Sequence, residues 1–175
     1  MDASRRAQQP DAERITELAR ADKRVLIESC FSIVDGDTER VVPFIFRGAQ
    51  DKYWRERSQL DLILKARKMG FSALIEAEFL ADCMLDENIN ALIVAHRDED
   101  TKILFERVKW MLKQLDFDVP VSTNAEGALV FSATNSTFRA ITARGKDPGR
   151  SRDINRLHLS ERAFYPDEGF LAAVE

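Results

Sequence analysis

A cluster of three cations follows a short apolar run in this chain and is the feature best suited to chemistry. The cluster is Lys65, Arg67 and Lys68, in the run DLILKARKMGFSALIEAEFLAD that spans 61–82. The preceding residues, Leu62–Leu64, are apolar without interruption, which is typical of a fully buried parallel strand. Cations placed where such a strand ends are suited to binding phosphate groups.

The residues after the cations predict how such a phosphate site would be completed. Gly70 allows a tight turn or a close approach of the backbone to a ligand, and Ser72 is a suitable helix N-cap. Apolar residues recur at helical spacing from Ser72 onward, and a helix N-terminus offers free N–H groups and a positive dipole to an anion. The order strand, basic loop and helix therefore predicts a phosphate-binding loop.

The loop departs from the ordinary P-loop pattern, GxxxxGK followed by Ser or Thr, at two positions. Lys65 occupies the first glycine position, and Phe71 stands where the lysine is expected. Lys65 or Lys68 could still supply an ammonium group to the phosphates, and Ser72 a hydroxyl to Mg²⁺. The alternative interpretation is a basic strand-to-helix turn that binds no ligand.

A carboxylate near the end of a second predicted strand is the candidate partner of this loop. The strand is expected at Ile154–Leu159 and is followed by Ser160 and Glu161. If it lies parallel to 62–64, both strands end at the same sheet edge, where open α/β sheets bind ligands. Glu161 could then polarise a water against a γ-phosphate, or it is an ordinary surface carboxylate. His158 is more simply a structural strand histidine than a catalytic base.

The composition is that of a soluble globular protein. The chain has 175 residues, one domain's worth, with 45% hydrophobic and 32% charged residues and a net charge of −4. It has no apolar run long enough to cross a bilayer and no apolar secretory segment near Met1, so a cytoplasmic protein is expected. Cys30 and Cys83 are expected to be buried free thiols. Although the net charge is negative, Lys and Arg residues are concentrated in two stretches of the sequence. The first basic patch contains residues 52, 55, 57, 65, 67 and 68, and the second contains residues 139, 144, 146, 150, 152 and 156.

The order of the predicted elements indicates an α/β fold with a parallel sheet flanked by helices. Residues 1–24 are expected to be a flexible or helical leader and 25–175 one P-loop ATPase domain. A β-hairpin, a second core strand with its helix, and two short strands complete the alternation of strands and helices. In chain order, these elements are a helix at 11–21, a hairpin at 29–46, a helix at 48–58, a strand at 90–96, a helix from 97 to 115, and strands at 128–132 and 137–142.

Several stretches in order resemble the large terminase subunits of tailed bacteriophages. LKARKMGFSALI is similar to the family's basic loop, and LHLSERAFYPD is similar to its LHLSEVAFW segment. ALIVAHRDEDTKILFERVKWML and STFRAITARGKDPGRSRDI resemble the region between them, and PFIFRGAQ resembles the upstream glutamine motif. The likeness covers roughly Ile27 to Pro166.

The resemblance implies an ATPase that drives double-stranded DNA into a procapsid, with ATP and Mg²⁺ as cofactors. It implies that Gln50 contacts adenine, that Glu161 activates water, and that Arg67 assists catalysis. It also implies that Ser72 and Ser160 would help to bind Mg²⁺. The residues around the phosphates would be Lys65, Arg67, Lys68, Gly70, Phe71 and Ser72. The implied partners are DNA, the phage portal, the small terminase subunit and other copies in a ring, in the cytoplasm of a host cell that carries the phage or prophage.

The sequence departs from the family pattern in three residues and in length. Lys68 replaces the usual Gln, Ala73 the usual Thr, and Ser160 stands where most P-loop ATPases have Asp. The sequence stops soon after the Glu161 motif, so we expect an incomplete ATPase domain without the nuclease domain. Nucleotide binding is then the safer expectation than turnover. The alternatives are a catalytically silent prophage remnant or assembly module, or another helicase-like ATPase.

Overall fold

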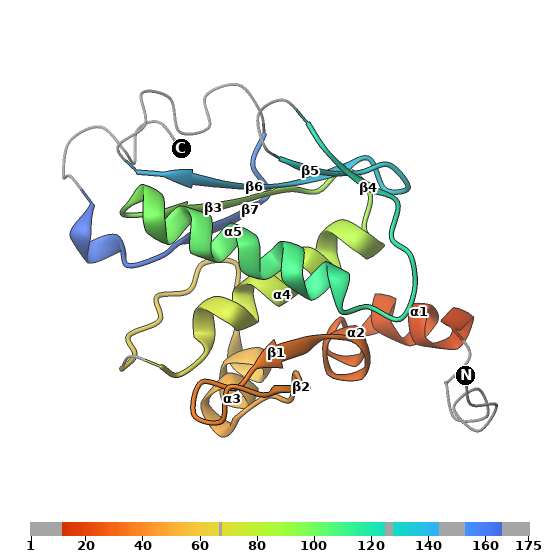
Figure 1. The fold of residues 1–175 in the computed structure, drawn as a ribbon, viewed down its shortest axis with the longest axis horizontal. Helices are drawn as coiled ribbons and strands as arrows, with labels where there is room; N and C mark the ends of the chain where they lie inside the picture. The colour runs from red at the N-terminus through yellow and green to blue at the C-terminus, as the bar shows by residue number, and fades with distance from the viewer. Residues whose placement is uncertain (1–11, 67, 125–127, 144–152, 166–175) are drawn as a thin grey trace.

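A computed structural model describes residues 12–66, 68–124, 128–143 and 153–165. An N-terminal group of small elements precedes the main sheet (Figure 1). This group consists of α1 (Ala12–Ala21), α2 (Arg24–Cys30), the antiparallel hairpin β1 (Ser32–Val34) and β2 (Val41–Pro43), and α3 (Gly48–Glu56). The predicted helices at 11–21 and 48–58 and the predicted hairpin are present. The hairpin is shorter than expected, because residues from Arg24 to Cys30 form a helix.

The main sheet has five strands in the order β4-β5-β6-β3-β7. Strand β3 (Asn90–Ala95) is central, and it pairs in parallel with β6 (Ser136–Thr142) and with β7 (Arg156–Leu159). The strands β4 (Val121–Thr123) and β5 (Leu129–Phe131) extend the sheet in antiparallel pairing. Five of the six β3 residues are buried, as the continuous apolar run predicts. The sheet is therefore mixed, and two of its parallel strands, β3 and β7, lie at stretches that were predicted as core strands, whereas the parallel pairing of β6 was not predicted.

Two helices cover one face of this sheet. They are α4 (Phe71–Leu85) and α5 (Asp98–Lys113), which pack with Ala91, Ile93 and Phe138 in one core cluster. Helix α4 lies between α5 and the N-terminal group and is apolar on most of its circumference, as a helix surrounded by protein must be (Figure 1). Because both helices run back along the parallel strands, the N-termini of α4 and α5 lie at the carboxyl edge of the sheet. The short 3₁₀ helix η2 (Arg162–Phe164) follows β7 at the same edge.

The strand expected at Leu62–Leu64 is absent, and this prediction is wrong. Residues 61–66 belong to no sheet, and Leu62 and Leu64 are 97% and 99% exposed. Strand β7 is an edge strand whose only strand neighbour in the described part of the chain is β3. An apolar run becomes a buried strand only where another strand pairs with it, and none of the described strands lies beside this one.

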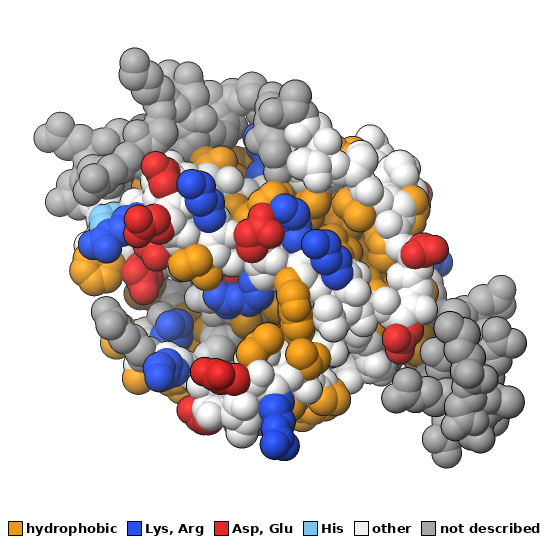
Figure 2. All heavy atoms as spheres, viewed as in Figure 1, with side chains coloured by type: hydrophobic (Ala, Val, Ile, Leu, Met, Phe, Trp, Pro, Cys, Tyr) orange, Lys and Arg blue, Asp and Glu red, His pale blue; other side chains and the backbone are white. Residues whose placement is uncertain are grey.

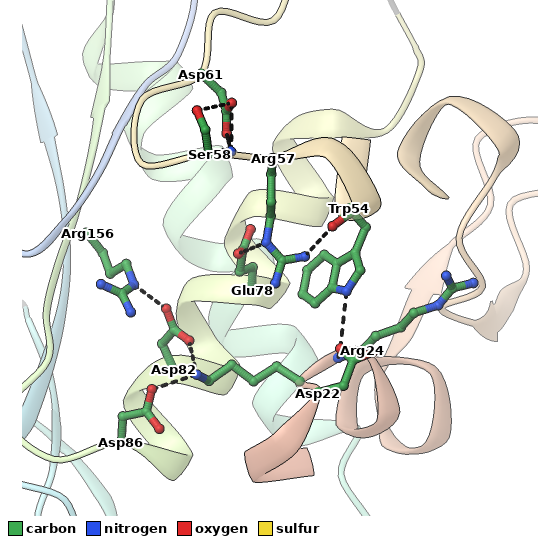
Figure 3. A network of polar contacts seen from close by, with 11 residues as sticks. Asp22, Arg24, Trp54, Arg57, Ser58, Asp61, Glu78, Asp82, Asp86 and Arg156 are labelled. Atoms are coloured by element: carbon green, nitrogen blue, oxygen red, sulfur yellow. Dashed lines mark hydrogen bonds and ion pairs between the residues drawn. The ribbon is translucent and has the colours of Figure 1, made fainter. Parts of the chain in front are cut away.

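A buried ionic network joins the N-terminal group, α4 and β7 (Figure 3). Asp82 of α4 is 3% exposed and accepts hydrogen bonds from Lys23, at 3.0 Å, and from Arg156 of β7. Arg57 pairs with Glu78 at 3.4 Å and stacks on the ring of Trp54. Arg156 and Arg57 belong to the two basic patches identified in the sequence, so part of each patch neutralises acids of α4.

Candidate functional site

The glycine of the basic loop has the conformation that a close turn requires. Gly70 is the N-cap of α4 and has φ +72°, in the left-handed region that favours glycine. Ser72 is the second residue of the helix and not its cap, which corrects the sequence prediction. Gly70 has no side chain that could cap α4, and the first turn of the helix contains no acidic residue. Within the part of the chain that the structure describes, the first N–H groups of α4 therefore have neither a cap from Gly70 nor an acid of their own turn, as suits an anion-binding helix end.

Gln50 fixes this loop from the neighbouring helix α3. Its side chain is 3% exposed, donates from Nε2 to the Gly70 carbonyl at 3.0 Å and accepts at Oε1 from the Arg47 N–H at 2.9 Å. A lone glutamine on a surface helix would normally be solvated, so its burial against Gly70 is a specific feature of this loop. A Cβ added at Gly70 would lie 2.9 Å from Gln50 Nε2.

A pocket of about 620 Å³ opens beside Gln50 and Gly70. Its size lies within the range of small-molecule sites. The hairpin and α5 supply apolar side chains, and the lining also contains three acids, Asp35, Asp37 and Glu106, beside three cations. The lining residues include Ile33, Val34, Phe44, Ile45, Ile103 and Trp110 as apolar groups, and Arg47, Lys68 and Arg107 as cations. Lys68, Gly70 and Gln50, all predicted site residues, are thus brought to one pocket.

Arg107 connects the pocket to a buried acid that the sequence analysis missed. Its Nε lies 3.5 Å from a carboxylate oxygen of Glu76, which is fully buried on α4. Neither carboxylate oxygen of Glu76 has a hydrogen-bond partner among the described residues. Burial raises the pKa of Glu76 to about 8, and the nearby Arg107 opposes this shift. The signal was present in the sequence, because any acid inside so apolar a helix must be buried.

Replacing Glu76 with Gln is expected to stabilise the fold increasingly as pH rises from about 4.5 to 8. A carboxyl group whose pKa is raised on folding holds its proton in the folded state where the unfolded chain has lost it, so the wild type loses stability across that window. At pH 8 the variant should be more stable by roughly 4 kcal/mol, with little difference at pH 4.5. Urea unfolding at both pH values measures this. A difference that is constant with pH, or larger at pH 4.5, would contradict the protonation state assigned to Glu76.

Lys65 lies on the other side of the loop, toward β7. Burial, together with the positive charge of Lys65, lowers the pKa of His158 to about 4. Nε2 of His158 is buried and has no hydrogen-bond partner among the described residues. The imidazole is therefore neutral at pH 7 and faces the interior of the sheet, which favours the structural role over that of a catalytic base.

Ser160 and Glu161 follow β7 at the carboxyl edge of the sheet. The Ser160 N–H donates to the Val94 carbonyl and extends the pairing with β3. Glu161 has φ +57°, and among the described non-glycine residues only five have a positive φ. Two of these are asparagines, which tolerate this region, and one is in the hairpin turn; the other two are Lys68 and Glu161, both predicted site residues. Such conformations concentrate at functional sites.

The predicted residues thus fall into two groups. Gln50, Lys68 and Gly70 border the pocket, whereas Ser160 and Glu161 follow β7 and the charge of Lys65 acts on His158 of that strand. Ser72 is half-buried in the first turn of α4. Phe71 is buried and packs edge-to-face with Tyr53, so it anchors the loop to α3. Arg67 lies outside the described residues.

Three further properties of the described residues bear on partners and ligands. Lys and Arg side chains are interspersed with Asp and Glu over the face in Figure 2, without a broad basic stripe in that view. None of the described helices combines the length and apolar character needed to span a membrane. The described residues contain no group of three or more His, Cys, Asp or Glu side chains arranged to hold a metal ion.

Comparison with known proteins identifies a shared fold. No protein-family model matches the chain, and no curated protein matches it by sequence. Among solved structures, the large terminase of bacteriophage HK97 is similar, with a TM-score of 0.67 and 18% sequence identity over 95% of this chain. The chain spans 34% of the length of that terminase. The predicted likeness to large terminases is therefore confirmed as a likeness of fold.

Proposed function

We propose that this chain is the nucleotide-binding part of a DNA-packaging ATPase of the large-terminase kind. In this proposal, ATP lies with its base in the pocket between the hairpin and α5 and its phosphates at the N-terminus of α4. The observation that carries the proposal is the joining of Gln50, Gly70 and Lys68 at one pocket, beside a helix end without a cap. The fold shared with the HK97 large terminase supports it.

The pocket suits a base and the loop suits phosphates for separate reasons. Apolar side chains from β1 and α5, Trp110 among them, offer the flat apolar contacts that an aromatic base requires. The free N–H groups of α4 and the cations Lys65 and Lys68 are suited to a polyphosphate. Gln50 already uses its amide to hold Arg47 and Gly70, so we propose that it links the base pocket to the loop.

Mg²⁺ would be held chiefly by phosphate oxygens, because this ion usually takes only one or two protein ligands in such sites. Ser72, in the first turn of α4, would supply a hydroxyl, and Ser160 is the second candidate. Bound there, the ion would neutralise charge on the phosphates. We propose that Glu161 orients the attacking water, and that Arg67 assists as a cation of the same loop.

Titration with a slowly hydrolysed ATP analogue and Mg²⁺ tests nucleotide binding by calorimetry. We expect saturable binding that Lys68→Ala weakens about tenfold or more, because a charge-assisted contact to phosphate is lost. The matched control is Lys52→Ala, since Lys52 is an exposed cation on the nearby helix α3 that does not line the pocket. Lys65→Ala should also weaken binding, whereas Glu161→Gln should retain it. An absence of binding, or equal losses in Lys68→Ala and Lys52→Ala, would contradict the proposal.

Hydrolysis in the presence of double-stranded DNA tests the motor part of the proposal. A packaging motor contacts the DNA backbone without sequence preference, so DNA of any sequence should stimulate turnover, and added salt should reduce the effect. Glu161→Gln should lower turnover by about 10²–10⁴-fold while leaving binding intact. Binding without turnover would instead favour a catalytically silent module. If the chain is an active motor, we propose the portal, the small terminase subunit and further copies in a ring as its partners.

A further inference from the structure

The segment 60–65, which belongs to no helix or strand, carries the most exposed leucines among the described residues. Leu60, Leu62 and Leu64 are 92%, 97% and 99% exposed. Within the described part of the chain, no backbone hydrogen bond joins residues 61–66 to another segment. Figure 1 shows the segment running below β7 between α3 and the basic loop. Alternating leucines beside unpaired backbone groups form the kind of edge that recruits another strand.

The segment alternates as a strand does, although no strand pairs with it. Ile63 packs against the core, whereas Leu62 and Leu64 on either side of it point away. Successive side chains of a strand lie on opposite faces, so in a strand the three leucines would share one face and Asp61, Ile63 and Lys65 the other.

We propose that this segment pairs with the same segment of a second copy of the chain. In an antiparallel pair centred on Ile63, Leu62 of one copy lies opposite Leu64 of the other, and Asp61 lies opposite Lys65. The sequence is therefore self-complementary in both hydrophobicity and charge, as a two-fold interface demands. The dimer would gather on one face six leucine side chains that are almost fully exposed in the single chain.

Net charge does not oppose this association. Each copy has a net charge of −4, but the segment itself contains one acid and one base between positions 60 and 65. Asp61 accepts hydrogen bonds from Ser58 and stays exposed, and Lys65 is exposed as well. In the proposed pair, Asp61 would add Lys65 of the other copy to its contacts with Ser58. Because Lys65 also belongs to the proposed phosphate site, Leu62→Lys is the variant that tests the dimer separately from nucleotide binding.

Sedimentation equilibrium over a range of protein concentrations tests the dimer. We expect a reversible dimer, and Leu62→Lys should raise its dissociation constant at least about tenfold, because each copy loses an apolar contact and gains a buried charge. Leu18→Lys is the matched control, since Leu18 is also exposed, at 49%, but lies on α1. Circular dichroism should show that both variants keep the fold.

A charge exchange tests the register. Asp61→Lys should weaken the dimer, because the new lysine of each copy would lie opposite Lys65 of the other. Adding Lys65→Asp in the same chain should restore the dimer. A monomer at all concentrations would overturn the proposal, whether or not another polypeptide covers the segment. Association that Leu62→Lys and Leu18→Lys reduce equally would overturn it as well. Failure of the double exchange to restore association would overturn the register proposed here.

Discussion

Replacing Asp82 with Asn is expected to lower the free energy of unfolding by about 3–5 kcal/mol, since it breaks a buried ionic contact on one side only. Asp82 is 3% exposed and is shared by Lys23 and Arg156, which come from opposite sides of α4. The amide would leave Arg156 without its carboxylate partner and Lys23 with Asp86 alone, at 2.6 Å. Urea unfolding followed by circular dichroism measures the change.

Glu56→Gln is the control for the Asp82 experiment. Glu56 pairs with Lys52 at 3.9 Å, and both side chains are largely exposed. Such pairs contribute about 0–1 kcal/mol, so this variant should unfold close to the wild type. Equal effects of the two substitutions would show that Asp82 does not join the N-terminal group to α4 and β7 as described.

Gly70→Ala is the second substitution with a large expected effect, a loss of about 2–4 kcal/mol of stability. A side chain in the left-handed region accounts for about 1–2 kcal/mol of this. The rest follows because the new Cβ would lie 2.9 Å from Gln50 Nε2 and would displace the amide that holds the Gly70 carbonyl. Nucleotide binding should weaken together with stability, since the loop and Gln50 would both move.

Gly36→Ala provides the matched control for Gly70→Ala. A Cβ at Gly36 meets nothing within 4 Å, and its backbone is outside the left-handed region. Thermal unfolding should therefore change little, within about 0.5 kcal/mol. A small effect at Gly70 as well would contradict the strained loop conformation described here.

Most helices and strands could be predicted because local sequence patterns specify them. The continuous apolar run at 90–95 is typical of a buried strand, and it forms one. The apolar residues between Asp98 and Lys113 recur at helical spacing and form one buried face. The turn at Asp35–Thr38 closes the hairpin through hydrogen bonds to the Asp35 carboxylate. These features depend on few distant contacts, so the sequence alone specifies them.

The parts that could not be predicted depend on partners far away in the sequence. Leu62–Leu64 has the composition of a core strand, but burial requires a neighbouring strand, and composition cannot supply one. Gln50 was identified as a site residue through family likeness, yet its burial against Gly70 depends on how α3 packs on α4. Arg107 and Glu76 meet only because α4 and α5 lie side by side, so a single-sequence pattern cannot pair them.

The most direct test of the central proposal is to map backbone amide signals by nuclear magnetic resonance while Mg²⁺ and a slowly hydrolysed ATP analogue are added. We expect the largest shifts at Gly70, Phe71 and Ser72 and at the indole N–H of Trp110, because phosphates would meet the end of α4 and the base would enter the pocket. Shifts confined to residues far from both, or unchanged spectra at saturating nucleotide, would contradict the account.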